Sequence, residues 1–275
     1  MEIKFEKINY YLKKENKILD NINLKIQKNT VVGIIGKNGS GKSSILEILS
    51  GLIKPNSGKI IIGDLVINKK EQYDKNKLYN KVFYSQTNKI SSSKKYIKDE
   101  IKSILKLKNL KITKEKMTIY LELLGLTEEF LNKEIKYLSS GEIELYNILI
   151  SLIIPSEIIL YDEPTAYLDY KNKKRIIRLM KNLTKNYNKT IIVVSRDIET
   201  IHKMCNQVVV LDEGKIIQTG DKYEIFTNTE LLQQCEIPMP NVIKFSNIVL
   251  KEKNVKMGYR DEINDLLKDI YRYVK

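Results

Sequence analysis

The chain has 275 residues, which allows one large domain or one domain with a small appendage. Apolar residues make up 42% of it, enough for a core of that size, but the longest nearly apolar run, 145–154, is too short to cross a bilayer. The formal net charge is +14, and the lysines behind it are spread along the chain. Without a basic arm or cluster, we expect no nucleic-acid partner.

The N-terminal segment carries charges where a secretory signal peptide needs an apolar centre. Cys205 and Cys235 lie thirty residues apart, without the spacing of metal ligands, which is typical of structural thiols. We therefore expect a protein that stays in the cytosol or in an equivalent reducing compartment.

The first part of the chain predicts a strand, a glycine-rich loop and a helix in direct succession. Strand-like runs in residues 1–35 end in a continuous apolar run, 31–35, typical of a strand buried on both faces. The loop 36–43 follows at once, and residues 44–49 have helical character. In this context the loop matches a P-loop, whose backbone N–H groups cradle phosphates at a helix N-terminus.

The loop residues predict a site for a nucleoside triphosphate. Lys42 would place its ammonium on the β- and γ-phosphates, and the hydroxyl of Ser43 would reach Mg²⁺. The residues expected to bind ATP here are Gly36, Lys37, Asn38, Gly39, Ser40, Gly41, Lys42, Ser43 and Ser44. We thus expect ATP and Mg²⁺ as cofactors.

After a turn at 55–58 and a strand-like run at 59–62, the pattern changes. Residues 96–131 have helical spacing, which predicts a mostly helical insertion between two halves of an α/β core. Two later apolar runs, 157–161 and 190–194, predict buried strands on either side of a basic helix. This alternation predicts a parallel sheet with helices on both faces.

The end of the chain has a different character. Residues 208–217 predict a hairpin, and the residues after about 223 form a small appended element that ends in a run of helical spacing, 263–274.

Two acidic residues follow the predicted strand at 157–161. Asp162 is placed to hold Mg²⁺, and Glu163 can orient and activate the attacking water as a general base. The alternative interpretation is that these two carboxylates only cap the start of a helix, and the P-loop upstream argues against it.

A second motif precedes that strand and consists of Leu138, Ser139, Ser140, Gly141 and Glu142. Ser139 offers a hydroxyl and Gly141 an exposed N–H at a helix start, which suits a γ-phosphate. We expect this stretch to reach the nucleotide of a second subunit and not its own, so that two such chains must meet face to face.

The P-loop, the stretch 138–142 and the run 161–164 in this order resemble the ATP-binding-cassette (ABC) ATPases over residues 1–222. The resemblance implies a P-loop NTPase fold of the ABC type, with a parallel core sheet, an antiparallel β subdomain and a helical subdomain at about residues 87–155. It also implies that Gln86 acts in catalysis and metal binding and links the Mg²⁺ site to a membrane partner, and that 166–169 is the D-loop.

The resemblance further places Tyr11 where the family stacks an aromatic ring on adenine. Tyr10 is adjacent, Leu12 is an alternative match, and a plain core tyrosine is a further interpretation.

The tail, 223–275, resembles the C-terminal extension of energy-coupling factor (ECF) transporter ATPases, through the short runs at 224–226, 231–232 and 237–240. In that family two ATPases sit under a transmembrane coupling protein and power the uptake of vitamins or transition-metal ions. The resemblance implies a peripheral ATPase at the cytoplasmic face of a membrane. Its partners would be a second ABC ATPase subunit and an integral membrane coupling protein.

The chain departs from the family at a position that acts in catalysis. Arg196 replaces a histidine that contacts the γ-phosphate, and His202, the only histidine, lies two helical turns further on. Arginine can stabilise phosphate charge but cannot exchange protons near neutral pH, so we expect slow hydrolysis at a site that includes Glu163, Gln86 and Arg196.

The motif 138–142 also departs, because Ser140 replaces a glycine and Glu142 a glutamine. Glu142 would add negative charge near the partner's phosphates unless it turns away. Both departures favour a heterodimer over a homodimer. The segment 87–95 is rich in Lys and Ser where ECF ATPases carry acidic residues.

Three other functions stay open at this point. The chain could be the ATPase of another ABC transporter, a soluble ABC protein that acts on ribosomes or DNA, or a partner that binds ATP only as a clamp. The solute cannot be named, because ATPase chains do not touch it.

Overall fold

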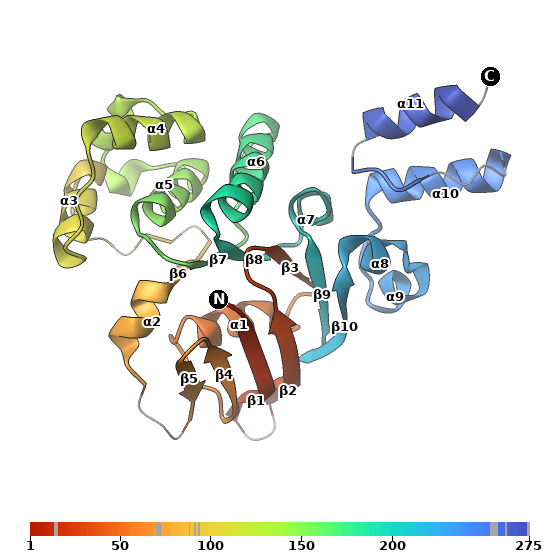
Figure 1. Ribbon diagram of the computed structural model, residues 1–275, viewed down its shortest axis with the longest axis horizontal. Coiled ribbons are helices and arrows are strands. Elements are labelled where there is room, and N and C mark those ends of the chain that lie inside the picture. Colours follow the sequence, from red (N-terminus) through yellow and green to blue (C-terminus); the bar gives the residue numbers. More distant parts are fainter. Residues whose placement is uncertain are drawn as a thin grey trace.

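The computed structural model describes residues 1–13, 16–69, 73–87, 89–90, 92, 94–253, 258–261 and 263–273. In this part of the chain, two sheets form the centre, a group of helices lies at one side, and a helical extension lies at the opposite side (Figure 1). The last two helices, α10 (Asn241–Lys253) and α11 (Ile263–Tyr273), lie side by side at that far end.

The larger sheet has the strand order β10-β9-β3-β8-β7-β6. Its strands are β3 (Val31–Ile35), β6 (Val82–Ser85), β7 (Ile158–Asp162), β8 (Thr190–Val194), β9 (Gln207–Asp212) and β10 (Lys215–Asp221). All neighbours are parallel except β9 and β10, which form the predicted hairpin. The parallel sheet and the strands predicted at 31–35, 157–161 and 190–194 are confirmed.

Alternate residues of the parallel strands belong to two different cores, because side chains of a strand point to opposite faces. On one face Val31, Ile191 and Val193 pack with the helical group and the extension. On the other face Ile34 and Val194 pack with α1 (Lys42–Leu49) and the smaller sheet. Both faces are covered, which explains why the strands appear as continuous apolar runs.

The smaller sheet is antiparallel and has the order β2-β1-β4-β5. Its strands are β1 (Ile3–Lys13), β2 (Asn16–Ile26), β4 (Ser57–Ile62) and β5 (Leu65–Asn68). The sheet covers α1 from the side away from the parallel sheet, so it completes the second core and supports the P-loop helix. The antiparallel subdomain implied by the family resemblance is therefore present.

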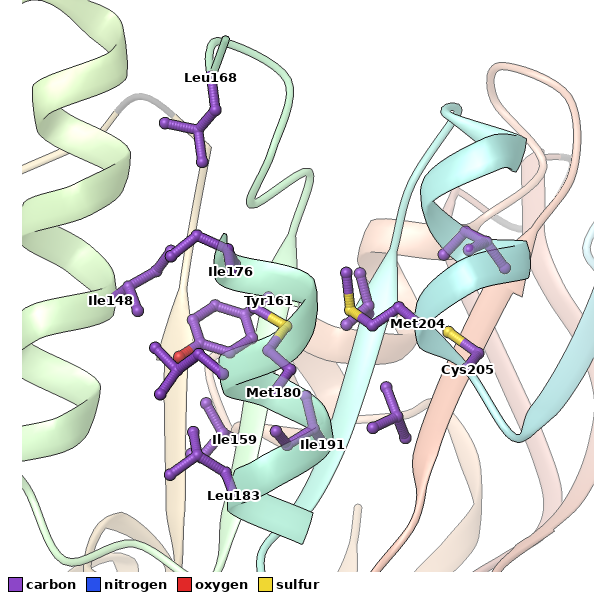
Figure 2. Close-up of a cluster of buried hydrophobic side chains, with 14 of the residues drawn as sticks. Ile148, Ile159, Tyr161, Leu168, Ile176, Met180, Leu183, Ile191, Met204 and Cys205 are labelled. Atoms are coloured by element: carbon purple, nitrogen blue, oxygen red, sulfur yellow. The ribbon is translucent and has the colours of Figure 1, made fainter. Parts of the chain in front are cut away.

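The helical group follows β6 and comprises α3 (Ile97–Leu107), α4 (Lys114–Leu124), η1 (Glu128–Asn132), η2 (Ile135–Tyr137) and α5 (Ser140–Ile153). A short helix, α2 (Lys75–Lys81), precedes β6. Figure 2 shows how this group joins the core: Ile148 of α5 and two residues of α6 (Tyr170–Tyr187), Ile176 and Met180, surround the ring of Tyr161. The helical insertion predicted at 96–131 is confirmed.

The extension starts at α8 (Lys222–Thr227) and continues through α9 (Thr229–Gln234) to α10 and α11. Phe226 is fully buried, and its ring meets the ring of His202 on α7 (Ile198–Met204) edge to face at 5.6 Å. The extension therefore shares the core of residues 1–222, and its status as a separate domain from 223 onward stays a prediction. Val274, the last residue of the predicted helical spacing, lies outside the described residues.

Candidate ATP site

A cleft of about 780 Å³ opens where β3, β7 and β8 end. Carboxyl ends of parallel strands meet at one edge of a sheet, which is where such folds bind ligands. The lining residues come from the P-loop and from the loops after β7 and β8, with three additions from other elements. They are Ile18, Asn38, Gly39, Gly41, Lys42, Ser43, Ser44, Thr87, Asp162, Glu163, Ala166, Tyr167, Lys173, Val194, Arg196 and Asp197.

Lys42 stabilises the conformation of its own P-loop by hydrogen bonds to the loop backbone. The Lys42 ammonium donates to the carbonyl oxygens of Gly36 at 2.8 Å and Lys37 at 2.6 Å, and the side chain is buried. Gly41 has a φ of +98° and lies so close to Ile18 that a Cβ would come within 2.8 Å of its carbonyl oxygen. The loop is thus preformed, with N–H groups at the start of α1 and a cation inside it, and it fits a triphosphate.

Ser43 and Asp162 lie next to each other in the lining of the cleft. Burial raises the pKa of the Asp162 carboxyl, and the hydrogen bond from the Ser43 hydroxyl offsets part of that rise. Thr87 donates to the backbone carbonyl of Asp162 at 2.5 Å, which fixes the end of β7. A hydroxyl and a carboxylate beside a phosphate cradle are the oxygen ligands that suit Mg²⁺.

Both carboxylate oxygens of Glu163 are engaged by the loop after β8. Oε2 accepts a hydrogen bond from the Ser195 hydroxyl at 2.9 Å, and Oε1 accepts one from the Arg196 N–H at 2.9 Å. Glu163 has a φ of +51°, and its own N–H donates to the carbonyl of Val194 at 2.8 Å. Burial raises the pKa of Glu163, and the bond from Ser195 opposes this. Sequence reasoning missed Ser195, because only the parallel pairing of β7 and β8 brings it to Glu163.

Arg196 lies in the cleft, whereas His202 does not. The Arg196 side chain is 70% exposed, and its Nε lies 3.6 Å from Oε1 of Glu163. His202 is completely buried between Phe226 and Tyr259 on the side of α7 that faces the extension. The expectation that His202 cannot take the place of Arg196 agrees with this placement.

The motif 138–142 lies at the start of α5 and does not line the cleft of its own chain, although Gly141 packs against the backbone of Tyr167 at the edge of that cleft. Ser139 caps the helix, and the Glu142 carboxylate folds back to accept the Ser139 N–H at 2.9 Å and its hydroxyl at 3.0 Å. Glu142 also pairs with Lys133, which lowers the pKa of its carboxyl. The negative charge expected near a partner's phosphates is therefore compensated within the chain.

Several predicted site residues lie outside the cleft lining. Tyr11, on β1, donates its N–H to Oδ1 of Asn56 at 2.8 Å, while Ile18 of β2 lines the cleft. Gln86 lines a neighbouring groove with Phe83 and Tyr84. The stacking of Tyr11 on adenine and the metal contact of Gln86 stay predictions.

Three loop residues that were expected to bind ATP also lie outside the lining. Lys37 forms an ion pair with Glu236 of the extension at 2.9 Å, and Ser40 is buried beside Gly36. Ile18 could have been found from sequence only by knowing that β2 crosses over the P-loop.

Comparison with known proteins shows the same family and the same fold. Residues 19–166 match the family model described as ABC transporter. The chain is 33% identical over 269 residues to the energy-coupling factor transporter ATP-binding protein EcfA2 of Acetivibrio thermocellus, covering 92% of this chain and 91% of that protein. It is 32% identical over 272 residues to EcfA1 of Ureaplasma parvum, covering 98% and 90%.

Two solved structures have the same fold. The dimeric post-hydrolysis state of the ATP-binding cassette MJ0796 bound to ADP and Pi has a TM-score of 0.70 at 27% identity, covering 80% of this chain and 98% of that chain. The structure of cbiO1 from Clostridium perfringens, part of the ABC transporter complex cbiONQ, has a TM-score of 0.68 at 26% identity, covering 89% and 98%.

The P-loop cleft, the acidic pair at the end of β7 and the capped motif on α5 define an ABC-type ATPase, an enzyme that hydrolyses ATP. The chain belongs to the ABC transporter ATP-binding family, within the group of energy-coupling factor transporter ATPases. In the part of the chain that the structure describes, no helix has the length and apolar character needed to span a membrane.

Proposed function

We propose that this chain is one ATPase subunit of an ECF-type importer and works at the cytoplasmic face of a membrane beneath a separate integral membrane protein. The observation that carries the proposal is the match to ECF ATP-binding proteins over more than nine-tenths of the chain, extension included. The solute would be a vitamin or a transition-metal ion, as in the family that the tail resembles.

The subunit would work in a dimer of two cassettes. The motif 138–142 does not line its own cleft. Ser139 is exposed at the helix start and Gly141 is half-buried beside it, so a second chain could reach this end of α5. The related cassette MJ0796 has been solved as a dimer. In the proposed assembly, each chain supplies a P-loop to one nucleotide and a Ser139-type cap to the other.

At its own cleft, the P-loop and Lys42 would bind and orient the triphosphate, and Ser43 and Asp162 would hold Mg²⁺ through oxygen atoms. Bound Mg²⁺ would neutralise charge on the β- and γ-phosphates. Glu163 would orient the attacking water and accept its proton while the bond between the γ-phosphorus and the ADP oxygen breaks. Gln86 would couple this site to the membrane protein.

This site would be slow, because Arg196 stands where a proton-exchanging histidine would help. Its guanidinium lies 3.6 Å from Oε1 of Glu163 and favours the charged carboxylate, so Glu163 becomes a weaker base. Arginine also keeps its proton at neutral pH. A second cassette that retains the histidine would then supply most of the turnover, which favours a heterodimer.

The proposal is tested by affinity purification of the tagged chain from detergent-solubilised membranes, with identification of the proteins that accompany it. Recovery of a second cassette protein and a small integral membrane protein is the expected result. Recovery of the chain alone or with ribosomes would contradict the transporter assignment and support a soluble ABC protein. Recovery with a large two-subunit permease would indicate another class of ABC transporter.

A further inference from the structure

The N-terminal cap of α5 is formed by Ser139 and Glu142, and binding of a phosphate by Ser139 does not require the negative charge of Glu142. Glu142 occupies the N3 position of α5. Its carboxylate accepts two hydrogen bonds from Ser139, one from the backbone N–H and one from the hydroxyl. A serine hydroxyl has a single proton, so this proton is committed to Glu142 in the isolated subunit. Ser139 can donate to a phosphate only if its hydroxyl breaks the hydrogen bond to Glu142.

Lys133 is the cation placed to make this exchange possible. It pairs with Oε1 of Glu142, the carboxylate oxygen that Ser139 does not use. Its backbone is fixed on both sides, because its N–H donates to the carbonyl of Phe130 at 3.1 Å and its carbonyl accepts the N–H of Ile97 at 3.2 Å. When Ser139 turns its proton to a phosphate, Glu142 keeps its bonds to Lys133 and to the Ser139 N–H.

The ion pair between Lys133 and Glu142 contributes little to the stability of the fold. Lys133 is 51% exposed and Glu142 26%, and exposed ion pairs contribute little to folding. An unpaired carboxylate at this helix start would instead repel a phosphate, at a place where the helix dipole favours anions.

We propose that Lys133 is a positioning residue of the ATP site that this chain completes in its partner: it neutralises Glu142 and retains its carboxylate on the cap, so that Ser139 and the start of α5 can receive the partner's phosphate. This inference rests on the proposed two-cassette function. It assigns to Lys133 an effect on ATP affinity that acts only through Glu142.

The test measures KM for ATP and kcat of the purified complex, in a Glu163→Gln background so that turnover comes from the partner's P-loop. Lys133→Ala should raise KM about tenfold at low salt, the effect of one uncompensated charge near a phosphate, with a smaller change in kcat. Higher salt should reduce the difference. Lys133→Arg should restore KM.

The decisive variant is Lys133→Ala combined with Glu142→Gln. Glutamine can make the same cap without the charge, so the double variant should return KM to within about twofold of Glu142→Gln alone. Lys136→Ala is the matched control, because Lys136 lies in the same segment but pairs with Glu134. Its KM should equal that of the unmodified chain.

Ser139→Ala separates the two levels of the proposal. If Ser139→Ala raises KM but Lys133→Ala does not, or if the double variant stays as impaired as Lys133→Ala, the role of Lys133 is wrong and the two-cassette site stands. If neither Ser139→Ala nor Lys133→Ala changes KM, the shared site itself is wrong.

Discussion

Gly141 lies against the backbone carbonyl of Tyr167: a Cβ at position 141 would be 2.9 Å from that oxygen. Tyr167 belongs to the turn that follows Glu163, in which the Ala166 N–H donates to the carbonyl of Glu163 at 3.2 Å. The motif proposed to serve the partner's nucleotide is therefore in direct contact with the loop that follows Glu163, the proposed general base.

This contact predicts that Gly141→Ala lowers the ATPase rate of the complex by about ten- to a hundredfold, because a displaced loop or motif misplaces reacting groups. Gly258→Ala is the matched control, because a Cβ there meets no atom within 4 Å, and it should keep the original rate. An unchanged rate in Gly141→Ala would show that the loop moves without consequence.

Ser195 should control the pH dependence of the chain's own site. Burial raises the pKa of Glu163, and the Ser195 hydroxyl partly offsets this, so its removal should raise that pKa further. A general base must be deprotonated, and the acid limb of kcat/KM should therefore move to higher pH in Ser195→Ala. The profile is best measured in an Arg196→His background, where this site is expected to turn over faster. Ser195→Thr keeps the hydroxyl and should keep the original profile.

Replacement of the general base should have an unusually small effect in this chain. Glu163→Gln should leave ATP binding intact and reduce the total ATPase rate of the complex only modestly, if Arg196 slows this site as proposed. Arg196→His should increase the rate, and adding Glu163→Gln to it should remove the increase. A large loss in Glu163→Gln alone would contradict the slow-site proposal.

His202 should make folding sensitive to acid. Burial lowers its pKa from 6.5 to about 4. As the pH falls from 6.5 to 4, the unfolded chain takes up a proton that the folded chain excludes, so the free energy of unfolding falls by up to about 3 kcal/mol. Urea denaturation at pH 7.5 and pH 5 measures this loss, which His202→Phe should reduce. An equal loss in both proteins would show that other groups carry it.

The class of this protein and the succession of its core strands along the chain follow from patterns within the sequence. The P-loop, the acidic pair at Asp162 and Glu163, and the strands around them depend on residues that are adjacent in the chain. Such local patterns can be recognised without a structure, because backbone geometry and side-chain periodicity act over a few residues. The departure at Arg196 is visible for the same reason.

Tertiary structure decided what holds those residues in place. Ser195 reaches Glu163 from 32 residues away, and Lys37 meets Glu236 from 199 residues away, through strand pairing and through packing of the extension. The sequence did not determine which way the Glu142 carboxylate points. In the structure it turns back to the Ser139 N–H and pairs with Lys133. Contacts between distant segments depend on how whole elements pack, and no local pattern contains that information.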